Sequence, residues 1–508
     1  MNEELESLDD RNTWEIVNKP EGISCIGSKW VYKVKTDSTG KIARYRARFV
    51  AQGFSQKKDI DYSESYAPVA NFSLIRMLIS ISISHNWVVH HLDIKCAYLY
   101  GKLREEIYMR LPPDHKDYSS KIAKLLRPIY GLKQSGRNWN NTIDEFLIKN
   151  GFERFKANNC VYTHGNDLIL TLYVDDIILF AQSIDKVNEV KTLLMSEYEI
   201  RNLGRASYLL GINIKYEGNK IRLSQSLYID KLLSEFGMND CKTSKTPIDP
   251  GIKLSKCDSP HSDVEKDEIK DIPYKQLIGS LMHVALATRP DILFAVTKLS
   301  QFNSNPGKAH WLQAKRVLRY LAATKENDLV YHCGTNELEI FSDADWASDV
   351  DDRHSYSGMI TFLNGNPIMW KSNKQKSIST STMEAEYVAL EVAVKEAIWL
   401  NMMFDELAKK TSFDVPSNPY LIRCDNKSAI DFTRNKIERS RTKHIDIAYH
   451  ITREMHEKGL IELKYVPSGD NVADVLTKPL PHTVMNKHVE KLRLRQLQSD
   501  QCGGFDRN

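Results

Sequence analysis

Two apolar runs separated by two acids constrain the fold of this chain more than any other feature. Residues 168–174 and 177–181 are apolar and rich in β-forming side chains, and only Asp175 and Asp176 lie between them. This spacing predicts a β-hairpin with both acids at its tip. An isolated Asp-Asp pair is most often an ordinary polar turn, but here the flanks are strongly apolar. Because adjacent carboxylates repel, a divalent cation is the usual way to hold them close together.

A third acid, Asp93, is a candidate to bind metal ions together with this pair. It ends a β-like segment that contains His90, His91 and Leu92, and helix-forming residues follow it. Hard oxygen ligands from two strand ends suit paired Mg²⁺ ions about 3.5–4 Å apart. We call Asp93, Asp175 and Asp176 the first acid set, and phosphoryl transfer is the chemistry it implies.

A second predicted hairpin, over residues 30–52, is strongly basic. Between Lys29 and Lys58 there are nine Lys or Arg and one acid. Arg46 and Arg48 alternate on one strand and therefore share a face. That face could hold a nucleotide triphosphate or template phosphates, and a solvated charged face is the competing interpretation.

Helical and strand patterns alternate over most of the 508 residues, enough for roughly three or four folding units. Helical spacing recurs within 139–147, 187–194, 229–236 and 274–325, and residues 239–271 are polar and irregular. After residue 336 the patterns predict strands at 338–342, 357–363, 366–371, 420–424 and 460–466, a long helix at 382–407, and shorter helices near 427–435, 443–458 and from 471. The fold class expected is α+β, followed by a compact α/β domain and a loosely attached polar tail after residue 480.

Short motifs in a fixed order identify a family resemblance. They are Lys29-Trp30-Val31-Tyr32-Lys33, the run from Arg44 to Gly53, Leu92-Asp93-Ile94-Lys95, Tyr130-Gly131-Leu132-Lys133-Gln134, Tyr173-Val174-Asp175-Asp176, Leu210-Gly211-Ile212, Ser342-Asp343-Ala344-Asp345-Trp346, Glu384-Ala385-Glu386-Tyr387, Cys424-Asp425-Asn426, Arg441-Thr442-Lys443-His444-Ile445-Asp446 and Val472-Ala473-Asp474. Each motif is weak alone, but the whole series resembles the reverse transcriptase and ribonuclease H portion of a copia-type LTR retrotransposon polyprotein.

The resemblance implies a domain order. Residues 12–238 would form the fingers, palm and start of the thumb of a right-hand polymerase, and 239–335 a polar linker and helical thumb or connection. Residues 336–480 would form a ribonuclease H-like domain, and 481–508 a basic polar tail.

The resemblance also implies roles for particular residues. The first acid set matches the palm triad of reverse transcriptases, with Asp93 and Asp175 as the principal metal ligands and Asp176 the least certain. Tyr98 stands where related enzymes carry an aromatic gate against the ribose 2′-hydroxyl, although a core aromatic is an equal alternative. Gly211 lies in a segment similar to the primer grip, where a glycine lets the backbone approach the primer.

The second acid set, Asp343, Glu386, Asp425 and Asp474, resembles the four-carboxylate site of ribonuclease H, which hydrolyses the RNA of an RNA–DNA hybrid with two metal ions. Glu384 competes for the helical position, but it is about 200° away from Glu386 around a helix. Glu386 is favoured, as in the family's helix, and Glu384 is expected on the solvent side.

The implied cofactor is Mg²⁺, with Mn²⁺ as the alternative. The implied partners are an RNA template, a DNA primer, the RNA–DNA hybrid, deoxynucleoside triphosphates, and other polyprotein products such as integrase and capsid. A net charge of +4, no apolar run of about 18 residues, and eight scattered cysteines without CxxC argue against membrane insertion and for a reducing compartment. The expected location is a cytoplasmic virus-like particle or the nucleus. The rival interpretation is a catalytically silent or repurposed retroelement remnant that only binds nucleic acid.

Overall fold

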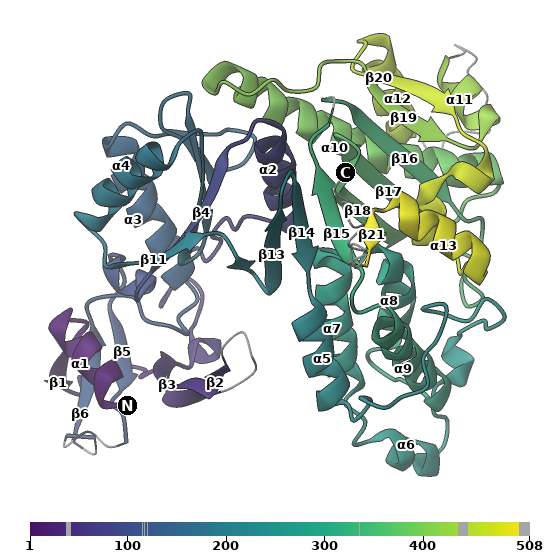
Figure 1. Ribbon diagram of the computed structural model, residues 1–508. Coiled ribbons are helices and arrows are strands. Elements are labelled where there is room, and N and C mark those ends of the chain that lie inside the picture. Colours follow the sequence, from purple (N-terminus) through teal and green to yellow (C-terminus); the bar gives the residue numbers. More distant parts are fainter. Residues whose placement is uncertain are drawn as a thin grey trace, which may run out of the picture. The chain divides into compact units, whose positions relative to one another are not determined.

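Each of two structural units is built from two separate stretches of chain. The structure, a computed structural model, describes residues 1–36, 42–113, 115, 117–118, 120–334, 336–434 and 446–496. The first unit comprises Met1–Ala70 and Val88–Arg205, and the second comprises Asn71–Trp87 and Ala206–Asn508 (Figure 1). The expected boundary at residue 238 therefore lies inside the second unit.

The first unit contains three antiparallel sheets. Its elements are α1 (Asn2–Asp10), β1 (Trp14–Asn18), β2 (Ser28–Thr36), β3 (Ile42–Ala51), η1 (Gly53–Ser55), β4 (Val88–Ile94), η2 (Ala97–Tyr100), β5 (Ile107–Arg110), β6 (Lys121–Leu125), α3 (Ser135–Lys149), β7 (Glu153–Arg154), β8 (Val161–Thr163), β9 (Leu168–Tyr173), β10 (Asp176–Ala181), α4 (Ile184–Met195) and β11 (Ile200–Arg205). The sheet orders are β1-β6-β5, β2-β3 and β11-β4-β10-β9-β8-β7.

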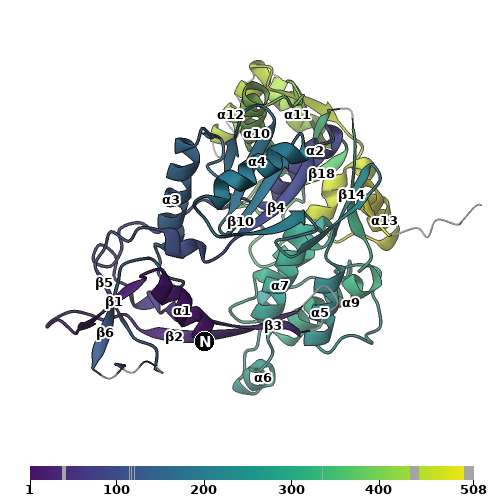
Figure 2. The ribbon, with the colours of Figure 1, turned by 60° about the vertical axis from the view of Figure 1, so that its left-hand side comes forward.

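The six-stranded sheet carries the main core of the first unit. Alternate residues of β4, β9 and β10, such as Leu92, Leu170 and Ile177, join apolar side chains of α3 and α4 in one buried cluster. Figure 2 shows α4 beside β10 and β4. Because side chains alternate along a strand, Asp93 and Asp176 point to the opposite face of this sheet. Both predicted hairpins, β2-β3 and β9-β10, are confirmed.

The second unit combines helices with two five-stranded sheets. Its elements are α2 (Phe72–Ser84), β12 (Tyr208–Leu209), β13 (Ile212–Glu217), β14 (Lys220–Ser224), α5 (Ser226–Glu235), η3 (Lys256–Asp258), α6 (Asp263–Ile269), α7 (Tyr274–Ala287), η4 (Pro290–Ile292), α8 (Leu293–Ser300), α9 (Lys308–Ala323), β15 (Asp328–His332), β16 (Leu338–Ala344), β17 (Tyr356–Leu363), β18 (Asn366–Lys374), α10 (Thr382–Lys410), β19 (Tyr420–Cys424), α11 (Lys427–Arg434), α12 (Asp446–Glu457), β20 (Ile461–Tyr465), η6 (Ser468–Asp470), η7 (Val472–Leu476), α13 (His482–Lys491) and β21 (Leu494–Arg495). The sheet orders are β12-β13-β14-β15-β21 and β18-β17-β16-β19-β20, with β16, β19 and β20 parallel.

A buried arginine explains why α2 belongs to the second unit. Arg76 is 3% exposed and donates hydrogen bonds to the carbonyl oxygens of Ile368 at 2.9 Å and of Leu286 and Ala287 at 2.7 Å. Its guanidinium also lies 3.7 Å from the ring centroid of Trp370. Burial lowers the pKa of Arg76 to about 10. These long-range contacts are invisible in the local pattern of residues 72–84.

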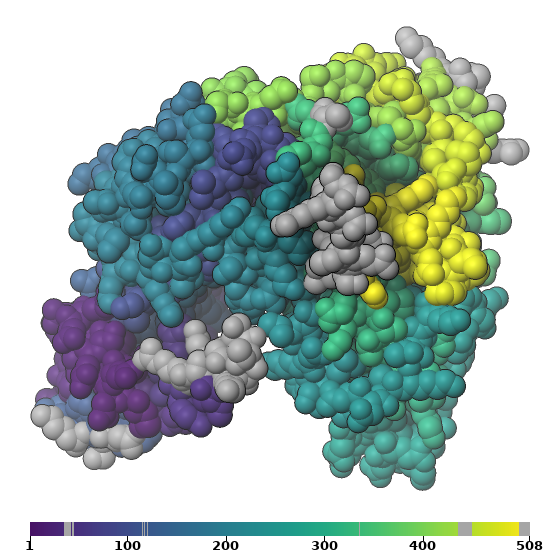
Figure 3. Space-filling model, in the orientation of Figure 1, coloured from purple at the N-terminus to yellow at the C-terminus, as the bar shows by residue number. Residues whose placement is uncertain are grey.

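The expectation of a loose polar tail from residue 481 is wrong for the residues described up to 496. Residues 482–491 form α13, and β21 pairs with β15 through Leu329 and Leu494. Met485, Leu492 and Leu494 are buried. Figure 3 shows this segment, in yellow, at the surface of the second unit. The few apolar side chains of this segment are buried because β21 pairs with β15, a long-range contact that the local sequence does not reveal.

Most other predicted elements are present, but the expectation that residues 239–271 are irregular is wrong at α6, a helix whose N-terminus is capped by Ser262 and Glu265. The mixed α/β fold class is confirmed, as are the helices within 274–325 and the strands and long helix after residue 336. Within the described residues, no helix has the length and apolar character needed to cross a membrane.

Candidate active sites

The turn between β9 and β10 differs by one residue from the predicted one. Val174 and Asp175 form the turn, whereas Asp176 is the first residue of β10 and pairs with Tyr173. Val174 has φ +58°, which is strained for a β-branched residue. Trp139 Nε1 donates to the Val174 carbonyl at 2.7 Å, and the Ile94 amide donates to the Asp175 carbonyl at 2.8 Å. Contacts with α3 and β4 therefore fix a turn that the local sequence does not favour.

Asp93 and Asp176 face each other across paired strands. They are direct partners in the β4-β10 register, and both are half-buried. Directly opposed residues have Cβ atoms about 4.5–5.5 Å apart. Asp176 Oδ1 also lies 2.7 Å from Nε2 of the buried His91. Asp176 is thus held by a protein partner.

Asp175 lies in the electrostatic field of the basic hairpin. Burial raises the pKa of Asp175, and the Asp176 carboxylate raises it further, while Arg48 and Arg46 on β3 lower it. Arg48 stacks 3.9 Å from the ring centroid of Tyr130 and donates to its hydroxyl at 3.1 Å. The structure thus brings Arg46, Arg48 and Asp175 within electrostatic reach of one another.

Tyr98 belongs to an aromatic pair beside the same acid. Its ring centroid lies 4.6 Å from that of Tyr130, and its side chain is half-buried. Burial raises the pKa of Tyr98, and the negative charge of Asp175 contributes to the increase. Tyr98 is therefore a packed aromatic that also lies near the first acid set.

Gly211 lies in the second unit, in the tight turn between β12 and β13. Leu210 and Gly211 have φ values of +51° and +86°, which suits a two-residue hairpin turn. A Cβ at Gly211 would lie 2.9 Å from Nε2 of His283. The turn and this close approach both favour glycine here.

Parallel strands bring two members of the second acid set together. Asp343 lies near the end of β16, and Asp425 directly follows β19. Ser342 pairs with Cys424 in the parallel register. Since parallel strands end at the same edge of a sheet, Asp343 and Asp425 meet there.

A helix and a 3₁₀ turn supply the other two acids. Glu386 lies in α10 and Asp474 in η7. Oxygens of Asp343, Asp425 and Asp474 lie within 4.8 Å of one another, as do ligand atoms of Glu386, Cys424 and Asp425. Within the described ranges these are the only such groups of three His, Cys, Asp or Glu residues. The structure therefore gathers the second acid set more tightly than the first.

Gly358, which the sequence interpretation missed, permits this gathering. It pairs with Asp343 in the β16-β17 register. A Cβ at Gly358 would lie 2.7 Å from Thr477 Cγ2 and 3.0 Å from the Ala473 carbonyl oxygen. Without a side chain at this position, η7 packs directly against β17. Thr477 then donates its hydroxyl hydrogen to Asp343 Oδ2. A glycine inside an apolar strand pattern was the available signal.

Three carboxyls of the second acid set, Asp343, Glu386 and Asp474, have raised pKa values. Burial raises the pKa of Glu386 to about 10, and Asp343 and Asp425 add to the increase. Burial and the charge of Asp343 raise the pKa of Asp474 to about 7. The pKa of Asp343 is also raised, mainly by burial. The site therefore favours any cation that compensates its negative charge.

Lys478 already supplies one positive charge. Its Nζ lies 3.1 Å from Asp474 Oδ1 and 3.7 Å from Asp343 Oδ2. Burial acts to lower the pKa of Lys478, but the Asp343 and Asp474 carboxylates raise it above the ordinary value. The spacing of four residues from Asp474 was the sequence signal for this contact.

The donor set of Asp343, Asp425 and Asp474 fits a hard divalent cation. Carboxylate oxygens are the ligands that such cations prefer. Cys424 does not fit this role, since burial and Glu386 hold the pKa of its thiol well above the ordinary value. Its Sγ lies 3.9 Å from Glu386 Oε2 as a weak donor.

The expectation that Glu384 faces solvent is wrong. Glu384 is only 9% exposed. Its Oε2 accepts hydrogen bonds from the Thr380 amide at 2.6 Å and the Thr380 hydroxyl at 2.7 Å. Its own amide donates to Ser381 Oγ at 3.2 Å. Glu384 thus stabilises the N-terminus of α10, while Glu386 joins the acids.

Comparisons with known proteins agree with the resemblance. The family described as "Reverse transcriptase (RNA-dependent DNA polymerase)" matches residues 11–250. The Retrovirus-related Pol polyprotein from transposon TNT 1-94 of Nicotiana tabacum is 38% identical over 95% of this chain and 36% of its own length. That from transposon RE1 of Arabidopsis thaliana is 33% identical over 97% of this chain and 33% of its own length. The chain thus spans about a third of each of these relatives.

A solved structure is also similar to this chain. The foamy viral protease-reverse transcriptase in complex with double-stranded DNA covers 90% of this chain and 68% of its own, with 12% sequence identity and a TM-score of 0.45.

Proposed function

Residues 11–250 belong to the reverse transcriptase family, and the chain is related along its length to the Pol polyproteins of copia-type retrotransposons; from this we propose that it is an RNA-directed DNA polymerase with a hybrid-specific ribonuclease H. The opposition of Asp93 and Asp176 on paired strands, with Asp175 in the adjoining turn, carries the polymerase assignment.

In the polymerase, Asp93 and Asp175 would hold the cations, and Asp176 would support them through its contact with His91. Mg²⁺ is the proposed cofactor, with Mn²⁺ as the alternative; when bound, such ions stabilise the developing charge on the attacking hydroxyl and the transferred phosphate. Because Asp176 is the first residue of β10, the strand and not the turn sets the orientation of its side chain.

Arg46 and Arg48 would bind the triphosphate of an incoming deoxynucleotide. Their electrostatic interaction with Asp175 supports this role, because phosphate binding and cation binding must occur side by side. Tyr98 would exclude a ribose 2′-hydroxyl, supported by its interaction with Asp175 and its packing on Tyr130. Gly211 would allow close backbone contact with the primer.

In the nuclease, Asp343, Asp425 and Asp474 would hold the cations with Glu386 beside them, and would orient a water toward the RNA phosphate. Glu386 holds a proton at neutral pH, in line with its raised pKa, and cation binding would displace it. Thr477 would fix Asp343 through its hydroxyl, and Lys478 would balance charge around Asp474.

The proposed substrates are an RNA template, a DNA primer, the RNA–DNA hybrid and deoxynucleoside triphosphates. Integrase and capsid products of a longer polyprotein are the proposed partners, and a cytoplasmic virus-like particle or the nucleus is the proposed location. The relatives' names as Pol polyproteins support this assignment.

Primer extension on poly(rA)·oligo(dT) with Mg²⁺ tests the polymerase, and cleavage of a labelled hybrid tests the nuclease. Asp175→Asn should reduce extension by several orders of magnitude and leave cleavage intact, because the two acid sets belong to different units. Extension by Asp175→Asn at the unmutated rate would contradict the palm assignment. A chain that binds the hybrid but neither extends nor cleaves would instead be a silent remnant.

A further inference from the structure

Trp346 is unusually exposed for a tryptophan of this chain. All eight tryptophans lie in the described residues, and Trp346 is the only one counted as exposed, at 50%. Four others, Trp14, Trp87, Trp139 and Trp370, are buried. Tryptophan is largely buried on average, and it is enriched among the residues that dominate binding interfaces, so an exposed indole in a fixed orientation is a candidate contact surface.

The indole of Trp346 is held in one orientation. Its Nε1 donates to the Ser379 carbonyl oxygen at 3.1 Å. Ser379 is itself buried, and its hydroxyl donates to Gln375 Oε1 at 3.0 Å. Gln375 Nε2 in turn donates to the Ala385 carbonyl at 2.9 Å, within α10. Trp346 is thus tied to the start of the helix that carries Glu386.

The backbone on both sides of Trp346 is also fixed. The Asp345 amide donates to the Tyr356 carbonyl at 3.1 Å, and the Tyr356 amide donates to the Asp345 carboxylate. Ala347 has φ +53°, which residues with a side chain adopt reluctantly, and its amide donates to Ser355 Oγ at 3.0 Å. Strained residues held by specific contacts cluster at functional sites, and here the strained residue directly follows Trp346.

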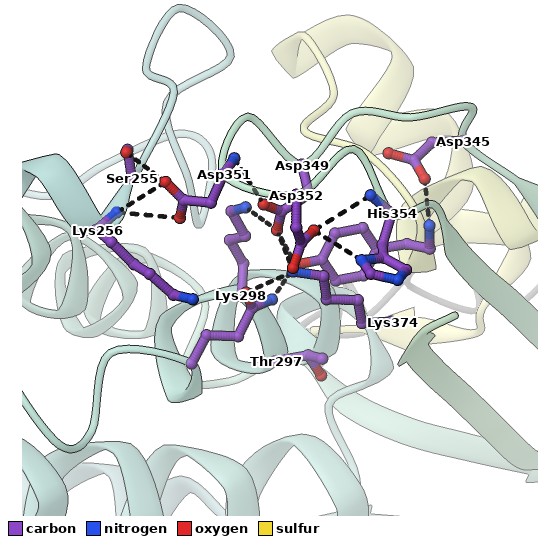
Figure 4. A network of polar contacts seen from close by, with 12 residues as sticks. Ser255, Lys256, Thr297, Lys298, Asp345, Asp349, Asp351, Asp352, His354 and Lys374 are labelled. Carbon is purple, nitrogen blue, oxygen red and sulfur yellow. Dashed lines mark hydrogen bonds and ion pairs between the residues drawn. The ribbon is translucent and has the colours of Figure 1, made fainter. Parts of the chain in front are cut away.

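The loop that follows Trp346 is anchored by buried ion pairs. Asp349 is fully buried and lies 2.7 Å from Lys298 of α8 and 2.9 Å from Lys374 of β18. Asp352 also contacts Lys374, at 2.7 Å. Figure 4 shows these carboxylates and lysines converging, with Asp345 at one side of the network. The exposed ring therefore projects from a rigid base.

Trp346 follows Asp343 by three residues, and its hydrogen bond to Ser379 connects it to the segment just before α10, the helix of Glu386. We propose that its ring packs against the sugar-and-base surface of an RNA–DNA hybrid in the minor groove, next to the bond that is cut. This inference rests on the proposed nuclease function. A-form-like duplexes have a wide, shallow minor groove that a flat aromatic side chain can reach, and the sugars exposed in it are the same for every sequence.

The test compares Trp346→Ala, Trp346→Phe and Met402→Ala in the whole chain, with hybrid cleavage as one readout. Met402 is 48% exposed and lies on the same helix, about 24 Å along the axis from Glu386. Trp346→Ala should raise KM about tenfold with kcat nearly unchanged, and Trp346→Phe should restore most of the affinity. Met402→Ala should match the unmutated chain.

Tryptophan fluorescence gives a readout that does not require cleavage. Adding a short hybrid should quench the emission of the unmutated chain, and the quenching should be largely lost in Trp346→Phe. Equal quenching in both chains, or an unchanged KM in Trp346→Ala, would overturn the proposal even when cleavage is normal. A concentration-dependent dimer that Trp346→Ala dissolves, with KM unchanged, would assign the ring to a second copy and would also overturn it. Quenching without any cleavage would support the Trp346 contact while contradicting the nuclease function.

Discussion

The first and second acid sets meet the same problem, mutual repulsion of carboxylates, in different ways. The first lies on the antiparallel β4-β10 pair and on the turn between β9 and β10, with every acid half-buried. The second comes from two strands, a helix and a 3₁₀ turn, and three of its four acids are buried. Arg46 and Arg48 offset the negative charge of Asp175 in the first set, and Lys478 offsets that of Asp474 in the second set.

The two acid sets therefore differ in how closely their carboxylates are packed together. Burial, and secondarily the charges of neighbouring acids, raises the pKa values of Glu386 and Asp474, so the packing of the surrounding elements holds these carboxyls where ionisation is unfavourable. The first set is less crowded, since no three of its ligand atoms form a tight group among the described residues. Cation binding should therefore change the stability of the second site more.

Glu386→Gln gives the largest expected effect. Removing this carboxylate should lower hybrid cleavage by about three orders of magnitude or more and leave primer extension unchanged. Glu384→Gln, the matched control, should keep most of the cleavage and lower the free energy of unfolding by about 1 kcal/mol, because it weakens the cap of α10. Cleavage assays and thermal melts measure both variants. Cleavage lost only in Glu384→Gln would reverse the assignment.

Gly358→Ala tests whether packing gathers the second acid set. The added Cβ would displace η7 and with it Asp474, so cleavage should fall about a hundredfold while extension persists. Gly469→Ala is the control, because a Cβ there meets no atom within 4 Å. Steady-state cleavage rates provide the measurement. Full cleavage activity in Gly358→Ala would mean that the close packing of η7 against β17 is not needed to gather the second acid set.

Tyr98→Val probes the first set on a smaller scale. If the ring excludes the 2′-hydroxyl, the ratio of ribonucleotide to deoxyribonucleotide incorporation should rise about tenfold, with cleavage unaffected. Tyr198→Val, in the same buried aromatic cluster, should leave the ratio unchanged. Competitive incorporation assays measure it. An unchanged ratio in a folded, active Tyr98→Val chain would make Tyr98 a packing residue.

The smallest effect expected is a pH-dependent loosening of the second site. The pKa values of Glu386 and Asp474 are about 10 and about 7, above the ordinary 4.5 and 3.8. The folded state therefore binds more protons than the unfolded state, and without a divalent cation its stability falls as pH rises from about 4 to about 7 through Asp474 and on to about 10 through Glu386.

Hydrogen exchange of the intact chain, corrected for intrinsic rates, measures this loosening. Peptides covering β16 and β19 should lose protection across that pH range, and Mg²⁺ should restore it. Peptides covering β9 and β10 should change less. Equal responses in both regions would remove the contrast between the two acid sets.

Local pattern was sufficient for most elements and for the identity of the acids. Continuous apolar, β-rich runs identified β9 and β10, and helical spacing identified α7, α8 and α9, because both signals depend only on short-range patterns of apolar side chains. Asp343, Asp425 and Asp474 followed from motif order, and the structure brings them together. Their roles in catalysis stay predictions.

Two features depended on tertiary structure. The chain pattern could not reveal that α2 joins the second unit, because Arg76 is satisfied by carbonyls more than 200 residues away. It could not place Val174 rather than Asp176 in the turn, since Trp139 and Ile94 fix that geometry. The capping role of Glu384, by contrast, is a local one, because Ser381 and Glu384 have the spacing of a capping box and Thr380 is only four residues away.

The sequence by itself determined which residues carry charge and which elements they lie on, because both depend on side-chain chemistry and short-range periodicity. Only the tertiary structure decided which carboxylates meet, which are paired with Lys478 or His91, and which aromatic ring remains in water. The physical reason is that burial and the distances between distant segments set electrostatic energies, and neither is a property of local sequence.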